Sequence, residues 1–127
     1  MASIEPLLKL AGRLALSAIF IWAAFGKIMN PSATVAQIQS AGMPMPGLMY
    51  ALALASLIAG GAMLLLGWRT RAGAAILVLY LAIATYYFHY NLADRMQMVM
   101  ALKNAGLAGG LLYVIASGPG KLSLDRG

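Results

Sequence analysis

Residues Pro46–Leu66 read PGLMYALALASLIAGGAMLLL, a run that contains no charged side chain. A bilayer core is about 30 Å thick, so a helix that crosses it needs about 20 predominantly apolar residues. This run has the required length, and Pro46 at its start and Gly67 just beyond its end are typical of helix boundaries. The segment therefore predicts a membrane-spanning helix.

Three further apolar segments approach the same length. Together they predict four spans, at residues 7–29, 46–66, 72–90 and 96–116. The connections between them are short or moderate, and no internal repeat separates the chain into parts. We therefore predict an all-α integral membrane four-helix bundle that forms one domain over residues 1–127.

Composition supports a membrane protein over a soluble one. Hydrophobic residues make up 62% of the chain and charged residues 9%, whereas soluble domains are roughly half apolar and a quarter charged. The net charge is +6, but the nine Lys and Arg residues are scattered singly, so we predict no nucleic-acid partner. Zero cysteines exclude a disulfide, an iron–sulfur cluster and a thiolate metal site within the chain, and no metal site is predicted.

The connection after the first span predicts a short additional helix. Asn30 is a suitable cap, Pro31 suits the first helical position, and Gly42 suits the end of a helix over residues 31–41. The helix is too short to cross a bilayer, so it either lies on the interface as a surface helix or covers the end of the bundle. Farther along, Asp94 is predicted to cap the last span.

The distribution of basic residues predicts the orientation. Cytoplasmic loops carry an excess of Lys and Arg. With four spans, both termini and the connection between the second and third spans lie on the same side, and this side holds six Lys and Arg residues. The other side holds only Lys27 and Arg95 near the helix ends. The six are Lys9, Arg13, Arg69, Arg71, Lys121 and Arg126. We therefore predict a multi-pass protein of a bacterial-type inner (plasma) membrane with both termini cytoplasmic.

Small residues predict where helices approach each other, because lipid tails give apolar helices no hydrophobic reason to associate. Ala51, Ala55 and Ala59 form a small stripe on the second span, and Gly106 and Gly110 form a GxxxG pattern on the fourth. We expect both sets at helix contacts.

Lys103 is the polar residue that most needs an explanation. It lies well inside the fourth apolar segment, where a Lys costs roughly 2.5–3.5 kcal/mol on insertion scales. The chain has only three acids, and Asp94 is about 13 Å away along a continuous helix. Lys103 must therefore extend outward to the interface, lose its charge, or meet a polar acceptor from a ligand, water or another subunit.

Lys27, His89 and Asn91 belong to the same half of the bundle by depth. Two readings remain open for Lys27 and His89. Lys27 either extends to the interface or contributes to a site, and His89 either bonds to the backbone or binds a ligand.

Several short motifs, in order along nearly the whole chain, resemble the DoxX family. They are Phe25-Gly26-Lys27 with Asn30-Pro31, the turn at residues 41–46, Gly60-Gly61 before residues 64–67, Phe88-His89, Leu102-Lys103-Asn104, and the ending at residues 117–120 with 122–125. The resemblance implies a four-helix inner-membrane protein, a membrane subunit of a quinone-linked oxidoreductase, with Lys27, His89, Lys103 and Asn104 at positions that the family pattern favours. In one departure, many relatives carry a Glu shortly before the glycine pair, where this chain has Leu57 beside Ser56.

From the resemblance and the polar residues together we predict a site for a quinone-like headgroup near the outer leaflet. Lys103 and His89 would donate hydrogen bonds to the carbonyl oxygens, Lys27 and Asn104 would lie nearby, and electrons would come from a redox partner protein. Aromatic packing on the ring is assigned to Tyr86, Tyr87 or Tyr90. The alternative is a non-catalytic scaffold or anchor of a larger complex or homo-oligomer. A carrier or channel is less favoured, because four short helices without inverted repeats offer little for alternating access.

Overall fold

The computed structural model describes residues 4–89 and 91–125, and the regular elements in this part of the chain are all helices. They are α1 (Glu5–Met29), α2 (Pro31–Ser40), α3 (Pro46–Leu66), α4 (Thr70–Phe88) and α5 (Arg95–Ser117). Four of them, α1, α3, α4 and α5, are long and apolar enough to cross a membrane, which confirms the predicted fold class. The third span begins and ends two residues earlier than the expected range, at Thr70 and Phe88.

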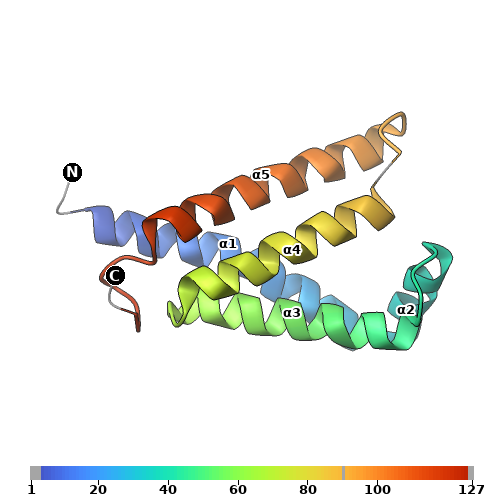
Figure 1. The fold of residues 1–127 in the computed structure, drawn as a ribbon, viewed down its shortest axis with the longest axis horizontal. Coiled ribbons are helices and arrows are strands. Elements are labelled where there is room, and N and C mark those ends of the chain that lie inside the picture. The colour runs from blue at the N-terminus through green and yellow to red at the C-terminus, as the bar shows by residue number, and fades with distance from the viewer. Residues whose placement is uncertain (1–3, 90, 126–127) are drawn as a thin grey trace.

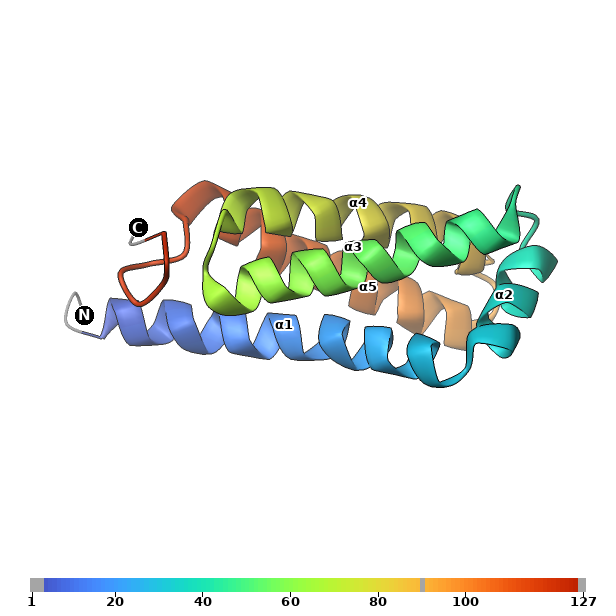
Figure 2. The same cartoon turned by 90° about the horizontal axis from the view of Figure 1, so that it is seen from below.

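The four long helices form a bundle with two different ends. The N-terminus of α1 and the segment after α5 lie together at one end, called here the terminal end, and α2 lies at the other, the α2 end (Figures 1 and 2). Helices α3 and α4 are close together where a short turn joins them at the terminal end. They diverge toward the α2 end (Figure 1). The distance between α3 and α4 is therefore smallest at the terminal end and increases toward the α2 end.

Helices α3 and α4 approach closely where two glycines cross. A Cβ atom on Gly73 of α4 would lie 2.7 Å from Cβ of Met63 and 3.3 Å from the carbonyl oxygen of Gly60. A Cβ atom on Gly60 of α3 would in turn lie 2.6 Å from Cγ of Leu77. Only residues without a side chain allow backbones to approach so closely. Gly60 and Gly73 therefore fix the distance between α3 and α4 beside the buried Leu64 and Leu77.

The small-residue stripes predicted from sequence are not the main contacts. Ala51, Ala55 and Ala59 are exposed, and a Cβ atom on Gly106 would have no neighbour within 4 Å among the described atoms. Only Gly110 of that pair packs against another helix, where its Cβ atom would lie 3.3 Å from Leu16 of α1. The prediction for Gly106 was wrong, because the spacing of small residues does not reveal which face of a helix meets protein.

Arg13 closes the terminal end of the bundle. Its side chain is 2% exposed. Its guanidinium donates hydrogen bonds to the carbonyl oxygens of Leu64 and Leu65 at the end of α3, and to those of Pro119 and Leu122 in the segment after α5. From sequence Arg13 is expected to be a basic residue that flanks the first span, whereas in the structure it joins α1, the end of α3 and the segment after α5. Buried charged groups need such complete hydrogen bonding.

The segment that follows α5 folds back across the same end. The backbone N–H of Leu124 donates to the carbonyl of Leu66, and that of Asp125 donates to the carbonyl of Gly67. These bonds satisfy carbonyl groups at the end of α3 that no further helical turn can satisfy. The C-terminal segment is thus part of the folded bundle.

The α2 end is organised by caps and by one tyrosine. Asp94 accepts a hydrogen bond from the N–H of Met96, which confirms the predicted cap of α5. Asn30 differs from expectation, since its side chain donates back to the carbonyl of Gly26 instead of capping α2. The hydroxyl of Tyr50 donates to the carbonyl of Lys27 at 2.8 Å and so ties the start of α3 to the end of α1.

Candidate functional site

A cavity of about 630 Å³ occupies the space where α3 and α4 diverge. Residues from all five helices line it, and α2 contributes Thr34, Gln37 and Ile38. Ile38 is 4% exposed, so α2 packs over the end of the bundle. Of the two positions predicted for this helix, this is the one in which it covers the bundle. Most of the remaining lining is apolar side chains of α3 and α4.

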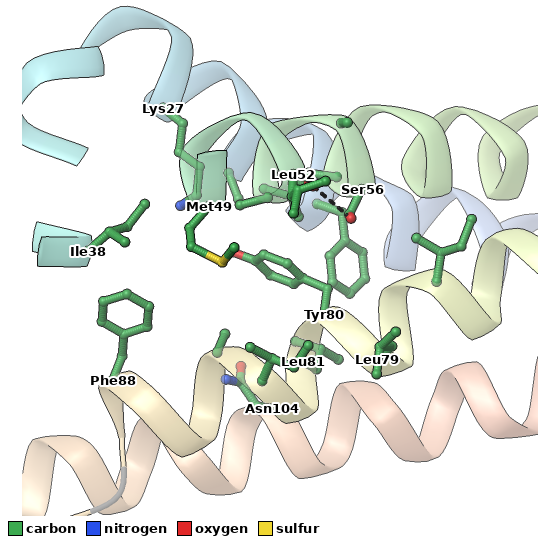
Figure 3. A pocket seen from close by; sticks show the side chains of 18 of the residues that line it. Lys27, Ile38, Met49, Leu52, Ser56, Leu79, Tyr80, Leu81, Phe88 and Asn104 are labelled. Atoms are coloured by element: carbon green, nitrogen blue, oxygen red, sulfur yellow. Dashed lines mark hydrogen bonds between the residues drawn. The ribbon is translucent and has the colours of Figure 1, made fainter. Parts of the chain in front are cut away.

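The cavity opens toward the membrane between α3 and α4. Leu52 of α3 and Leu79 and Ile83 of α4 line it and are also among the exposed apolar residues. Figure 3 shows α3 and α4 on opposite sides of this space, with Leu52 and Ser56 on one and Leu79 and Leu81 on the other. A ligand dissolved in the lipid phase therefore has a lateral, apolar path to the interior.

Four of the residues predicted for a site line this one cavity: Lys27, His89, Lys103 and Asn104. They come from three different parts of the chain, at the end of α1, after α4, and within the first half of α5. The sequence predicts a similar depth for them, and the packing of the bundle places all four beside one cavity.

Lys27 lies on the α1 side of the cavity. Figure 3 shows its side chain extending into the cavity toward Met49. Its own carbonyl is held by Tyr50, so the last turn of α1 is fixed in place beneath the side chain. Within the described chain the Lys27 ammonium has no hydrogen bond or ion pair, so its charge is free to meet a ligand.

Asn104 is fixed by a partner on the neighbouring helix. Its side-chain amide donates to the hydroxyl of Thr85 at 3.0 Å, and the residue is 8% exposed. This bond links α5 to α4 beside the cavity and uses one of the two N–H donors of the amide. The amide oxygen and the second N–H stay available to a ligand.

His89 and Lys103 lie close enough to influence each other electrostatically. Partial burial lowers the pKa of His89, and the positive charge of Lys103 lowers it further. His89 is therefore neutral at neutral pH, with one ring nitrogen as donor and the other as acceptor. Lys103 lines the cavity without a hydrogen-bond or ion-pair partner in the described structure.

The aromatic residues around the cavity differ from those expected. Tyr86 is 71% exposed and stacks edge-on against Tyr87, and neither lines the cavity. Tyr90 lies outside the described residues. The aromatic residues that line the cavity are instead Phe20, Phe88 and Tyr80, and the ring of Tyr80 reaches toward Met49 in Figure 3.

Rotation around the helix axis explains the position of Tyr86. It is six residues beyond Tyr80, which at 3.6 residues per turn turns its side chain about 120° away from that of Tyr80. The sequence offered no signal for Tyr80, which is a single aromatic residue within an apolar run. Asn91 also lies away from the cavity, in the exposed turn where its N–H donates to Gln97.

Comparison with known proteins identifies the family. The model of the DoxX family matches residues 8–90, about two thirds of the chain. This chain belongs to the DoxX family. The family match ends before Lys103 and Asn104 and so does not cover these two residues.

Two relatives match over nearly their whole length. The inner membrane protein YqjF of Escherichia coli K12 is 31% identical over 126 residues, which cover 99% of this chain and 95% of YqjF. The inner membrane protein YphA of the same organism is 35% identical over 127 residues, which cover 96% of this chain and 91% of YphA. No solved structure matches the chain. A DoxX-family membrane protein, with inner-membrane relatives and four apolar spans, is therefore established.

Proposed function

We propose that this DoxX-family protein is a membrane subunit of a quinone-linked oxidoreductase and that it binds a quinone headgroup in the cavity between α3 and α4. The observation that carries the proposal is the convergence of Lys27, His89, Lys103 and Asn104 on one apolar cavity with a lateral opening. Quinones are apolar rings with two carbonyl acceptors and a hydrocarbon tail, and they are dissolved in the lipid phase.

The cavity suits such a ring in size and chemistry. Its volume of about 630 Å³ lies within the roughly 300–1,000 Å³ of small-molecule sites, which combine apolar walls with a few polar groups. Lys27, His89 and Lys103 offer N–H donors for carbonyl oxygens, and Tyr80 and Phe88 offer aromatic surface. The tail would leave between Leu52 and Leu79 toward lipid.

The residues of this chain determine which roles fall to the protein and which to the quinone. A quinone supplies the capacity to take up electrons and protons, and the residues of this chain bind and orient it. Neutral His89 can hold a proton at one ring nitrogen. Leu57, beside Ser56, stands where the family resemblance implies a carboxylate, and it is fully buried and lines the cavity, so no acid near it competes for that proton. Electrons come from a redox partner protein in this proposal.

The proposed orientation places the α2 end outside and both termini in the cytoplasm of an inner membrane. The terminal end carries most of the basic residues that flank the spans, which supports this direction. The quinone site would then lie in the outer half of the membrane.

One observation favours the second candidate, a scaffold subunit of a larger complex. Lys103 is exposed on α5 and has no partner within the described structure, as expected for a residue that pairs with a carboxylate of another subunit. In that case Lys103 would matter for assembly and not for a bound ring.

The test measures quinone binding and folding on the same samples. The protein is purified in mild detergent, bound quinone is extracted and quantified by mass spectrometry, and the binding of a short-chain ubiquinone is titrated. Lys103→Met should abolish binding and leave thermal stability unchanged or higher, since an apolar chain of similar length replaces an intramembrane cation. Lys121→Met is the matched control, because Lys121 is exposed at the terminal end and does not line the cavity. Full quinone occupancy in Lys103→Met would overturn the proposed site, and a stable co-purifying protein without quinone would favour the scaffold.

A further inference from the structure

The three Asp and Glu side chains of this chain all have partners outside the cavity. Glu5 pairs with Lys9 at 3.2 Å, Asp94 caps α5, and Asp125 binds the N–H groups at the start of α4. The sequence contains no other Asp or Glu. No Asp or Glu side chain can therefore supply a counter-charge to the cations that line the cavity.

Those cations are Lys27 and Lys103. Both line the cavity, one from α1 and the other from α5, and neither has a hydrogen-bond or ion-pair partner among the described residues. Ionisable residues at membrane depth normally pair with an opposite charge or with polar acceptors, because an unpaired charge in an apolar medium is costly. The cavity thus has two positive charges on largely apolar walls, and the described residues that line it include no carboxylate.

We propose that the cavity binds an ionised acidic amphiphile, a molecule with one carboxylate, phosphate or similar anionic group and a hydrocarbon body. The anionic group lies between Lys27 and Lys103, within reach of Asn104, and the hydrocarbon body lies along Leu52, Leu79 and Ile83 toward lipid. This inference rests on the same cavity as the proposed function, but it assigns the ligand a charge that a neutral quinone does not have.

Charge-assisted hydrogen bonds explain the selectivity. A carboxylate or phosphate oxygen accepts from an ammonium roughly twice as strongly as a neutral carbonyl accepts from a neutral donor. A neutral ligand of the same shape would fill the cavity and leave both lysines without a counter-charge. The acid should therefore bind more tightly than a matched alcohol.

The experiment uses the full chain in nanodiscs of neutral phosphatidylcholine. The probes are an oleic acid analogue with a mid-chain diazirine and the alcohol of identical chain. After illumination, protein labelling is quantified and the labelled residues are mapped by mass spectrometry. The acid should label at least about tenfold more strongly than the alcohol at equal concentration. Its adducts should map to residues near Leu52, Leu79 and Ile83.

Variants assign the effect to the two lysines. Lys27→Met combined with Lys103→Met should remove the preference for the acid and leave labelling by the alcohol in place, which also shows that the cavity is intact. Lys121→Met removes the same charge far from the cavity and should change nothing. Equal labelling by acid and alcohol in the wild-type protein, or an unchanged preference in the double variant, would overturn the inference.

Two further arms separate the sources of the acid and the two proposals. Replacing part of the phosphatidylcholine by phosphatidylglycerol should reduce labelling if a phospholipid headgroup is the occupant, and should leave it unchanged if the occupant is a free single-chain acid. Either result is consistent with the acidic class. If short-chain ubiquinone binds while the acid and the alcohol label equally, the proposal of an acidic ligand is refuted and the proposal of a quinone ligand stands. If the acid labels selectively and ubiquinone does not reduce this labelling, the proposal of a quinone ligand is refuted and the proposal of an acidic ligand stands.

Discussion

The carboxylate of Asp125 caps α4 through Thr70, which lies 55 residues earlier in the chain. One carboxylate oxygen accepts both the backbone N–H of Thr70 at 2.8 Å and its hydroxyl at 2.6 Å, and the other accepts the N–H of Arg69 at 2.8 Å. Arg69 has a left-handed backbone with φ of 46°, an uncommon conformation for a residue with a side chain. The C-terminal segment therefore supplies the N-terminal cap that the local sequence of α4 lacks.

This cap makes stability depend on pH in the acid range. The hydrogen bonds from Thr70 hold the pKa of Asp125 below its ordinary value, with a smaller contribution from the nearby charge of Arg13. A carboxyl with a lowered folded-state pKa stabilises fully above its unfolded value of about 4 and loses that contribution as the pH falls through the folded value. Asp125→Asn should melt at a lower temperature than wild type at pH 7, and the difference should shrink as the pH falls below about 4. Detergent-phase thermal unfolding from pH 7 to pH 3 measures this, and a constant difference across the range would contradict it.

Arg13 should be the most sensitive basic residue of the chain. Its guanidinium donates to four main-chain carbonyls on two separate segments, so its removal leaves several buried acceptors unsatisfied. Arg13→Met should lower the free energy of unfolding by about 3 kcal/mol. Arg13→Lys should recover only part of this loss, because a compact ammonium cannot span the acceptors that a planar fork reaches.

Arg71→Met is the control for Arg13. Arg71 is exposed and its Nε donates to one carbonyl, that of Ile115. Its replacement should cost under about 1 kcal/mol, the range of ordinary surface changes. Equal losses for Arg13→Met and Arg71→Met would mean that the C-terminal segment does not close the bundle.

Sequence predicts the spans of this protein well and the faces of its helices poorly. Long apolar runs and helix-ending residues define α1, α3, α4 and α5 because the bilayer requires a minimum length. Periodicity does not then reveal which face points inward, because the lipid is as apolar as the core. Lys27 and Lys103, which the sequence groups by depth, line the same cavity, whereas the tyrosine there is Tyr80 and neither Tyr86 nor Tyr87. The contacts of Arg13 and Asp125 had no local signal, since their partners lie far away in sequence.

The glycine crossing gives a direct test of which helix faces meet. Gly73→Ala places a Cβ atom 2.7 Å from Cβ of Met63, and it should destabilise the bundle by about 1–3 kcal/mol. Gly106→Ala meets open space and removes a flexible residue from a helix interior, so it should be neutral or stabilising by about 0.5–1 kcal/mol. Thermal unfolding in detergent compares the two variants. The opposite ranking would mean that α5, and not the α3 and α4 crossing, forms the tightest contact.

Reporter fusions test the proposed orientation. A fusion after Arg69 and one at the C-terminus should both report cytoplasm, and one after Asn91 should report the outside, because basic residues concentrate at the terminal end. The fusion after Asn91 follows α4 and precedes α5, so it samples the α2 end. An outside signal at Arg69 would reverse the orientation and move the cavity to the cytoplasmic half of the membrane.

The coupling of His89 and Lys103 tests whether one ring contacts both residues. Each single change, His89→Ala or Lys103→Met, should weaken the binding of short-chain ubiquinone, because each removes a donor to a carbonyl oxygen. The double variant should lose less than the sum of the two single losses, with an interaction term of about 0.5–3 kcal/mol, since residues that share one partner are not independent. Lys103→Arg should rescue binding poorly, because a planar guanidinium does not replace a compact ammonium in a fitted space. Size-exclusion profiles and thermal unfolding on the same samples check that every variant is folded. If the two losses add within about 0.3–0.5 kcal/mol, His89 and Lys103 act on separate ligands or in separate parts of the protein. The proposed quinone site would then include only one of the two residues.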